Sequence, residues 1–323
     1  MKTSRRALLG SVPAVVLLAA PALSQESWPR REAIRAIVPY PPGAGTDMMV
    51  RGMAPHLERA IPGSRIAVIN RPGATAELGH AAIAQAAPDG YTYGIVVTPS
   101  LQTVTIERVA RYGMDDFAFL AGISEDPGAF VVRSESPLRT LADLMAHVRA
   151  NPDRVSVGTA GVGSDDHLLM LEFAQKLGAP MVHVPFPGVA PVMTALVGGH
   201  IDVAAMNVAE ALQGIAGGRF RCLAQAAEQR IPMAPDIPTF RELGLDMVSG
   251  ITRGYAMPSQ TPASIAGQMT KAIEAVMQDG AWQADAERLS LPLRYWDPAA
   301  YRRIVTEQDA MLRRRWQAAP WAN

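Results

Sequence analysis

The sequence predicts an α/β protein of two lobes, each with its own mainly parallel sheet. An apolar run that ends in a Gly/Pro-rich loop and leads into apolar residues at helical spacing spans residues 37–57. The same pattern returns at residues 155–171. Strand-like and helix-like stretches alternate as far as residue 206, which is typical of parallel sheets covered by helices on both faces. Two such loops in different parts of one chain indicate two lobes that grip one ligand.

The first loop joins a strand to a helix that Thr46 or Asp47 opens. Gly43 and Gly45 let the backbone approach a ligand closely. The first unpaired N–H groups of the helix, with its positive dipole end, point into the same space, so the loop is a candidate anion site. An ordinary strand-to-helix turn uses the same residue types, and the first loop alone leaves both interpretations open.

The second loop repeats this chemistry with Gly161 and Gly163, and Ser164 is expected to cap the helix that follows. Thr98 and Ser100 come directly after another predicted strand. Ligands in sheets of this type bind at the carboxyl ends of strands. We therefore expect these two hydroxyl side chains to lie at the ligand end of the first lobe.

The first lobe has βαβαβ order, with a strand at 66–70, a helix at about 77–87 and a strand at 91–97 after the first helix. The second lobe repeats the alternation. Its predicted segments are strands at 129–133, 155–158, 181–184 and 201–206 and helices at 140–150, from 164 onward and at about 190–197.

The composition shifts from Arg230 onward. A Pro-rich loop, a short helix at 240–243, a long helix capped by Thr261, and helices near 282–289 and 298–316 are predicted there. These helices have no sheet of their own, so we expect them to pack back on the first lobe. The predicted domains are residues 25–124 and 226–323 for lobe 1 and 125–225 for lobe 2, with crossings near 124–128 and 225–228.

Residues 1–24 have the pattern of a cleavable export signal. Lys2, Arg5 and Arg6 precede an apolar run, and Arg5 and Arg6 form the pair of a twin-arginine signal. An N-terminal membrane anchor is the alternative, but the run is shorter than the roughly 20 residues that span a bilayer. We expect cleavage after Ser24 or Ala22 and a protein that works in the periplasm.

Charge and composition exclude several classes of function. The chain has 30 basic and 30 acidic residues, and it has no basic run with interleaved aromatic residues, so nucleic-acid binding has no electrostatic basis. The single cysteine, Cys222, excludes an internal disulfide, a CxxC pair and a cysteine zinc site. We expect no cofactor and no metal.

Catalysis finds little support in the residues. The sequence contains no nucleophile elbow, P-loop, HExxH pair or complete dinucleotide fingerprint. Ser164, Asp166 and His167 are the nearest approach to a hydrolase set, but they are too close together on one helix start to form a relay. Adjacent Asp165 and Asp166 diverge on a helix, so helix capping explains them better than a metal site.

The chain resembles the Bug-type (TctC-like) receptors, the extracytoplasmic solute-binding proteins of tripartite tricarboxylate transporters. The likeness covers essentially the whole mature chain in seven motifs that keep their order. They are Val38-Pro39-Tyr40-Pro41-Pro42-Gly43-Ala44-Gly45-Thr46-Asp47, Asn70-Arg71-Pro72-Gly73-Ala74, Pro88-Asp89-Gly90-Tyr91-Thr92, Gly161-Val162-Gly163-Ser164 with His167-Leu168, His183-Val184-Pro185, Gly198-Gly199, and Pro235-Asp236-Ile237-Pro238-Thr239 with Glu242-Leu243-Gly244.

This resemblance implies a type II periplasmic-binding-protein fold, in which two doubly wound α/β lobes joined by two crossing strands close on a small carboxylate. The ligand is an organic acid, an amino acid or an aromatic acid, and the partners are the membrane permease subunits of a tripartite transporter. We expect a monomer. Main-chain groups and water in the two loops hold the carboxylate. The residues implied are Tyr40, Pro42, Gly43, Ala44, Thr46 and Asp47, with Gly161, Gly163, Ser164 and His167 opposite.

Departures from the family pattern alter the pocket wall, so no relative's ligand can be transferred. Phe186 and Asn207 stand where relatives carry other residues, and we add them to the predicted site. If Asp165 and Asp166 face the cleft, they favour a ligand with one carboxylate, or one polar or cationic end, over a tricarboxylate.

Two roles stay open for Asp47: it stabilises the helix dipole, or it accepts a hydrogen bond from the ligand. His167 is expected to pack against the loop and steady it, with direct ligand contact as the alternative. A sensor module that partners a membrane signalling protein and a secreted hydrolase remain the alternative functions.

Overall fold

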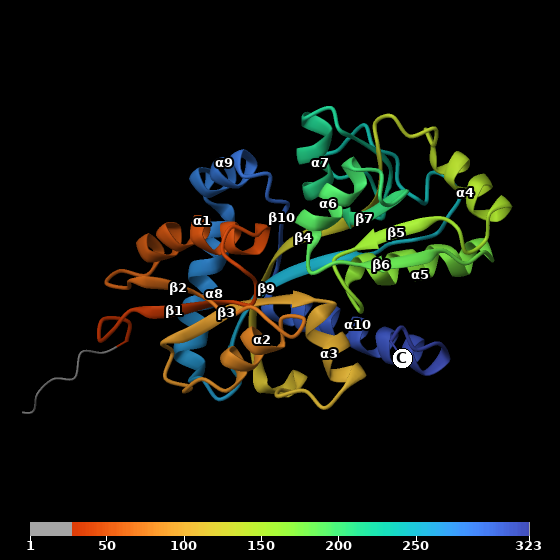
Figure 1. Ribbon diagram of the computed structural model, residues 1–323. Coiled ribbons are helices and arrows are strands. Elements are labelled where there is room, and N and C mark those ends of the chain that lie inside the picture. The colour runs from red at the N-terminus through yellow and green to blue at the C-terminus, as the bar shows by residue number, and fades with distance from the viewer. Residues whose placement is uncertain (1–27, 323) are drawn as a thin grey trace, which may run out of the picture.

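Figure 1 shows a computed structural model of the protein, which describes residues 28–322. The predicted export signal at residues 1–24 lies outside the described residues. One part of the molecule holds β1, β2, β3, α1, α2, α8 and α9, and the other holds α4 to α7 with β5 and β6 (Figure 1). We call these the first half and the second half.

The first half begins with three parallel strands in the order β2-β1-β3, which are β1 (Ile34–Val38), β2 (Ile66–Asn70) and β3 (Thr92–Thr98). Helices α1 (Gly45–Ala60), α2 (Glu77–Ala84) and α3 (Ser100–Glu107) follow these strands in the chain. Alternate residues of β1 face opposite cores: Ile34 and Ala36 pack with α1, and Ile37 packs with α2. Helices therefore cover both faces of this sheet, as the sequence predicts.

The second half contains the strands β5 (Ser156–Thr159), β6 (Val182–Pro185), β7 (Val203–Asn207) and β8 (Phe220–Gln225), and the helices α4 (Leu141–Ala150), α5 (Asp165–Leu177), α6 (Val189–Val197) and α7 (Val208–Ala216). β5 pairs in parallel with β6 and β7. The side chains of Phe130 and Val132 pack on the side of α4 and α5, and those of Ala129 and Val131 pack on the side of α6 and α7.

One long strand joins the two halves. β4 (Phe117–Arg133) pairs with β9 (Gly250–Pro258) in the first half and with β7 and β8 in the second. Each half thus has its own set of paired strands, as the sequence predicts, and β4 takes part in both sets and links them into a continuous order of ten strands. The sequence pattern detected only the end of this strand, from residue 129, and the strand begins at residue 117.

The C-terminal region supplies two strands that the sequence pattern missed. β9 lies between β3 and β4, and β10 (Leu293–Trp296) pairs with β4. The helices α8 (Ala263–Gln278), α9 (Gly280–Arg288) and α10 (Pro298–Ala318) agree with prediction. α8 begins one residue later than predicted, with Pro262 as its N-cap in place of Thr261.

Residues 240–244 form a turn and not the short helix that was predicted. Thr239 and Glu242 still exchange hydrogen bonds in a capping-box pattern, 2.7 and 3.0 Å long. Phe240 is buried in the core of the second half, with its ring 5.4 Å from that of Phe130.

The predicted lobe boundaries remain predictions. Residues from Ala226 to Met247 contribute to the core of the second half, and Ser249 bonds to Gly128 on β4. We therefore infer that the chain returns to the first half near Gly250. Near its start α10 packs in the core of the first half, with Tyr301 and Val305, and farther along Leu312 packs beside Leu168 of α5. Figure 1 shows α10 running from the first half toward the second.

Within residues 28–322, none of the helices combines the length and the apolar character that crossing a membrane demands.

Candidate functional site

The loop before α1 is held open by a buried carboxylate. Asp47, 2% exposed, accepts hydrogen bonds from the backbone N–H of Gly43 at 2.8 Å, from Asn70 at 2.8 Å and from Arg51 at 3.0 Å. Burial acts to raise the pKa of Asp47, but these donors outweigh burial and hold it below its usual value. The carboxylate of Asp47 thus fixes the conformation of the loop, and both of its oxygens are already hydrogen-bonded to protein donors.

The start of α1 presents its backbone outward. The residue before the helix is Ala44, whose methyl side chain cannot accept a capping hydrogen bond. The prediction that Thr46 or Asp47 opens the helix as a cap is therefore wrong by one or two residues, since the helix begins at Gly45. The first N–H groups of a helix have no partner within it, and here no cap takes their place. This helix end can receive an anion.

The loop before α5 is closed by its own side chains. Ser164 caps the helix as predicted, since its Oγ accepts from His167 N at 3.2 Å, and the same Oγ donates to Gly161 O at 2.8 Å. The ring Nδ1 of His167 accepts from Gly163 N at 3.2 Å. These contacts are those of a histidine that steadies the loop.

His167 is buried and neutral. Its ring stacks on that of His183 with 3.8 Å between centroids. Burial, with a smaller contribution from the charges of His183 and Arg315, lowers the pKa of His167 to about 3. His183 is in turn within 2.7 Å of Thr159 Oγ1. The pair forms an uncharged wall under the second loop.

Gly163 faces the first half and the C-terminal segment. A Cβ at this position would collide with the carboxylate of Glu107, the last residue of α3. Trp321 lies on the same spot, and its indole N–H donates to Glu107 at 2.5 Å. Gly163 is therefore covered.

Arg253 on β9 connects the two halves. It is 6% exposed, and its guanidinium donates to Thr46 Oγ1 at 3.2 Å and to Ser124 Oγ at 3.3 Å. It also lies 3.7 Å from Asp126 Oδ2. The guanidinium thus joins the N-terminus of α1 to β4.

Asn207 continues this network into the second half. Its side-chain N–H groups donate to Asp126 O at 3.2 Å and to Asp165 Oδ2 at 2.8 Å, and Asp165 is the first residue of α5. Its backbone N–H donates to Glu210 Oε2 at 3.2 Å in the capping box of α7. An unbroken series of polar contacts therefore runs from the start of α1 to the starts of α5 and α7.

Four carboxyl groups gather around this network: Asp126, Asp165, Asp166 and Glu210. Burial raises the pKa of Asp126 to about 6, against the charge of Arg253. Burial and the charge of Asp126 raise the pKa of Glu210 to about 8. Burial also raises the pKa of Asp165 and, together with the charge of Asp165, that of Asp166.

Two hydroxyl pairs complete the first-half side. Tyr40 OH lies 3.2 Å from Ser100 Oγ, and Thr98 Oγ1 lies 3.0 Å from Thr252 Oγ1. Burial raises the pKa of Tyr40, and among the further causes are the charges of Asp165 and Glu210. Tyr40 is thus within electrostatic reach of the carboxyl groups of the second half.

The structure brings part of the predicted site together. Five of the predicted residues take part in the contacts above or are affected by the charges of Asp165 and Glu210: Tyr40, Thr46, Thr98, Ser100 and Asn207. Exposed or half-buried in the first loop are Pro42, Gly43 and Ala44. The remaining predicted residues make contacts outside the polar network, and Phe186 packs against the core of α6 and α7. They are Asp47, Gly161, Gly163, Ser164, His167 and Phe186.

Sequence reasoning missed Arg253, Ser124, Asp126 and Glu210. A signal for Arg253 was present, since a single charged residue interrupts the otherwise uncharged stretch 247–258. A charge in such a stretch is rarely buried without a partner.

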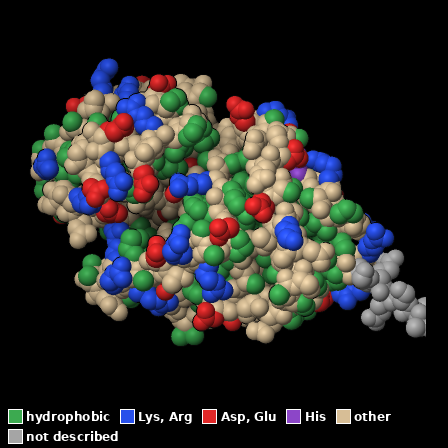
Figure 2. Space-filling view, turned by 180° about the vertical axis from the view of Figure 1, so that it is seen from behind, with side chains coloured by type: hydrophobic (Ala, Val, Ile, Leu, Met, Phe, Trp, Pro, Cys, Tyr) green, Lys and Arg blue, Asp and Glu red, His purple; other side chains and the backbone are tan. Residues whose placement is uncertain are grey.

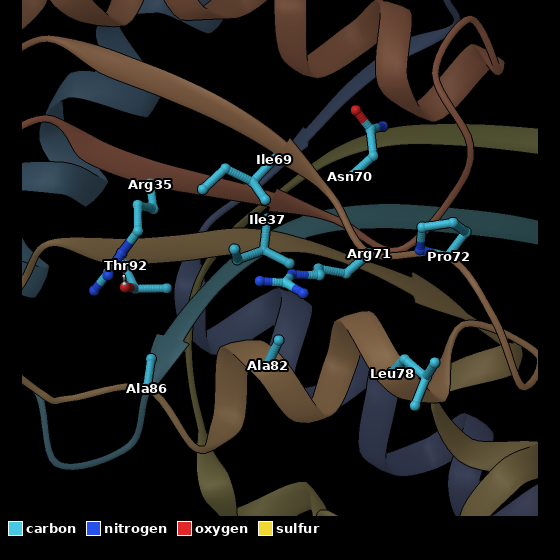
Figure 3. Close-up of a pocket in the computed structure, with 10 residues that line it drawn as sticks. All are labelled: Arg35, Ile37, Ile69, Asn70, Arg71, Pro72, Leu78, Ala82, Ala86 and Thr92. Carbon is cyan, nitrogen blue, oxygen red and sulfur yellow. Dashed lines mark hydrogen bonds between the residues drawn. The ribbon is translucent and has the colours of Figure 1, made fainter.

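One hollow lies away from this network. Figure 3 shows it between α2 and the strands β1, β2 and β3, with a volume of about 600 Å³. None of the predicted site residues lines it. A second hollow, of about 480 Å³, lies between α5, α10 and the start of β9, and Pro99 and Asp165 line it. Of the four carboxyl groups, Asp165 therefore borders this second hollow.

Charged side chains of both signs are interspersed over the described surface in the view of Figure 2. Among residues 28–322 no group of three or more His, Cys, Asp or Glu side chains is placed to hold a metal ion. The acidic groups above thus meet as neighbours in one network, without the geometry of a metal site.

Residues 49–315 match the family model described as the tripartite tricarboxylate transporter family receptor. The protein BugT of Bordetella pertussis is 31% identical over 249 residues, which are 74% of this chain and 73% of that protein.

Two solved structures are similar over most of the chain. A TctC solute-binding protein from Polaromonas, without ligand, has a TM-score of 0.73 and 29% identity over 87% of this chain and 96% of its own. MatC from Rhodopseudomonas palustris with bound malate has a TM-score of 0.77 and 25% identity over 87% of this chain and 98% of its own. The α/β periplasmic-binding-protein fold predicted from the sequence is thereby confirmed.

Proposed function

Because the chain belongs to the tripartite tricarboxylate transporter receptor family, whose members are solute-binding receptors and not enzymes, we propose that it captures a small carboxylate between its two halves and delivers it to a tripartite transporter. The family is one of periplasmic binding proteins. Export by the segment at residues 1–24, with cleavage near Ser24, is part of the same proposal.

The observation that carries the proposal is the polar series Thr46–Arg253–Asp126–Asn207–Asp165. It places the N-terminus of α1, from the first half, and that of α5, from the second, at two ends of one short network. A ligand that touches both ends couples the two halves.

The carboxylate is assigned to the first end. Backbone N–H groups at Gly45 and Thr46 and the dipole of α1 favour an anion there, and the nearby guanidinium of Arg253 adds positive charge. The ligand's second functional group then faces Tyr40, Ser100 and the second half. MatC, a structural relative, binds malate, a small carboxylate, and this supports the ligand class without naming the ligand of this protein.

Closure would bring the second half toward α1. β4 and the chain near Gly250 connect the halves, so bending at these two crossings moves one half against the other without breaking either core. The closed form would be the one that the membrane subunits recognise.

The test is a binding measurement with the purified exported protein. A thermal-shift screen of mono- and dicarboxylates, amino acids and aromatic acids should find compounds that raise the melting temperature, and calorimetry then gives their affinities. Thr46→Val should weaken binding roughly tenfold, about 1.4 kcal/mol, because the helix end loses a hydroxyl that also orients Arg253. The matched control is Thr270→Val, which removes a hydroxyl from α8 that donates to Leu120 O, away from the network. If no carboxylate binds, the proposal is wrong.

A further inference from the structure

The carboxyl groups of the network outnumber its positive charges. Arg253 pairs with Asp126, the more central of the four. For Asp165, Asp166 and Glu210, no Lys, Arg or His of residues 28–322 lies within 4.0 Å. The charge of Arg253 acts on Asp165 and Glu210 from farther away, so one guanidinium serves three of the four carboxyl groups and none of Asp165, Asp166 and Glu210 has a cation in direct contact.

One of these groups has an unused oxygen. Asp166 is 3% exposed, and its Oδ2 accepts from Ala160 N at 3.1 Å. Its Oδ1 is buried and has no hydrogen-bond partner in the described part of the chain. A buried acceptor without a donor costs about 1–3 kcal/mol, so this oxygen calls for a donor from outside the protein.

The region is reachable. Asp165 and Glu210 are half-buried, and Asp165 lines the hollow of about 480 Å³ between α5 and α10. The charges of Asp165 and Glu210 act on Tyr40, across from them in the first half. Because Tyr40 belongs to the loop before α1, a small molecule held at the N-terminus of α1 and passing Tyr40 would extend toward Asp165 and Glu210.

We propose that the ligand is an amino-carboxylate, with its carboxylate at the N-terminus of α1 and its ammonium group among Asp165, Asp166 and Glu210. The inference deepens the proposed function and rests on it. An ammonium group supplies both missing elements, a positive charge and N–H donors. A second carboxylate would find neither a positive charge nor an N–H donor among these three groups, and it would be tolerated only if they stayed protonated.

Amino-carboxylates and dicarboxylates should differ in whether the protein releases or takes up protons when they bind. Glu210, with its pKa near 8, is mostly protonated at pH 7 before binding. An ammonium group favours its ionised form, so an amino-carboxylate releases protons on binding. A dicarboxylate would be accepted by protonated carboxyl groups and would take protons up.

The experiment compares matched acids that differ by the amine: aspartate with succinate, glutamate with glutarate, and 4-aminobutyrate with butyrate. Titration calorimetry at pH 7 in phosphate and in Tris, which differ in ionisation enthalpy, gives affinity and protons exchanged. We expect the amine-bearing member of at least one pair to bind roughly tenfold tighter or more, with proton release. If in every pair that binds the amine-free acid binds as tightly as its partner, or if the amine-bearing acid binds with proton uptake, the inference is overturned while the proposed function stands. Failure of both classes overturns the proposed function.

Variants locate the effect. Glu210→Gln keeps an acceptor for Asn207 N and removes the charge, so it should abolish most of the preference for the amine. Glu274→Gln makes the same change on an exposed face of α8 and should leave the preference unchanged. Asp165→Asn serves as a second variant should Glu210→Gln not fold. A preference that survives the folded variants contradicts the assignment.

Discussion

The loops before α1 and α5 share a strand, a pair of glycines and a helix start, yet the protein uses them differently. The first loop has no side-chain cap and leaves its backbone outward, held from behind by Asp47. The second is capped by Ser164, braced by His167 and covered by Trp321. The comparison teaches that glycines before a helix mark a loop that needs unusual backbone angles, and that the capping and covering side chains decide whether it can bind an anion.

The largest expected effect on stability comes from removing Trp321, whose side chain covers the second loop. Trp321, 6% exposed, packs with Leu168 and Leu312 and bonds Glu107. Trp321→Ala should lower the free energy of unfolding by about 3 kcal/mol, because a large buried side chain and its hydrogen bond are lost. Denaturant unfolding measures this. Trp28→Ala, at the other end of the first half, is the comparison for removing a partly buried tryptophan. A loss below 1 kcal/mol for Trp321→Ala would show that the C-terminal segment does not cover the loop.

The next largest effect is a difference in stability between alanine substitutions at Gly163 in the second loop and Gly43 in the first. Gly163 (φ +73°) and Gly43 (φ +82°) both have left-handed backbone, so alanine strains each by about 1 kcal/mol. At Gly163 the new methyl also meets Glu107, whereas no described atom lies within 4 Å of a Cβ on Gly43. Gly163→Ala should therefore cost about 2 kcal/mol and Gly43→Ala about 1 kcal/mol in unfolding free energy. Equal losses would contradict the distinction.

His167, which steadies the second loop, should make the free energy of unfolding depend on pH. His167 titrates near its ordinary pKa of 6.5 when unfolded and at about 3 when folded, so the unfolded state binds the proton first as pH falls. Stability due to His167 is present above pH 6.5 and is lost on acidification, by up to about 1.4 kcal/mol per pH unit.

His167→Gln isolates this contribution from that of the carboxyl groups, whose raised pKa values act in the opposite direction. Between pH 7 and pH 5 the wild type should lose more unfolding free energy than the variant. Parallel curves for the two proteins would mean that His167 is not held neutral.

The smallest effects come from exchanging the caps. Ser164→Ala should cost about 1 kcal/mol because α5 loses its cap. Ala44→Ser should raise stability by about 0.5 kcal/mol while weakening carboxylate affinity, because the new hydroxyl competes for the N–H groups of α1. Unfolding and calorimetry on the same preparations measure both. Tighter binding by Ala44→Ser would place the carboxylate elsewhere.

Sequence patterns predicted the parallel strands and most helices well, because the apolar residues of each segment recur at the spacing of a strand or at that of a helix. β9 and the first part of β4 escaped, since Arg253 interrupts one and Glu125, Asp126 and Pro127 interrupt the other. Such residues favour turns locally. They form strands here because β4 and β9 pair along nine positions from Phe117 to Pro127.

The candidate site was predictable from the sequence only where it depends on local features. Backbone chemistry in the first loop is visible in the sequence, and so is Ser164 as a cap. The roles of Arg253, Asp126 and Glu210 depend on distances between segments more than 80 residues apart, such as the 3.2 Å from Asn207 to Asp126 O. The cover on Gly163 depends likewise on Trp321, 214 residues from Glu107.

The most direct measurement is a crystal structure of the protein with the tightest-binding carboxylate of the screen. The account predicts a carboxylate oxygen within about 3 Å of the backbone nitrogens at Gly45 or Thr46, and the rest of the ligand directed toward Asn207 and Glu210. A ligand bound instead in the hollow beside Arg35 and Arg71, or one that touches only the loop of Gly163, would contradict it.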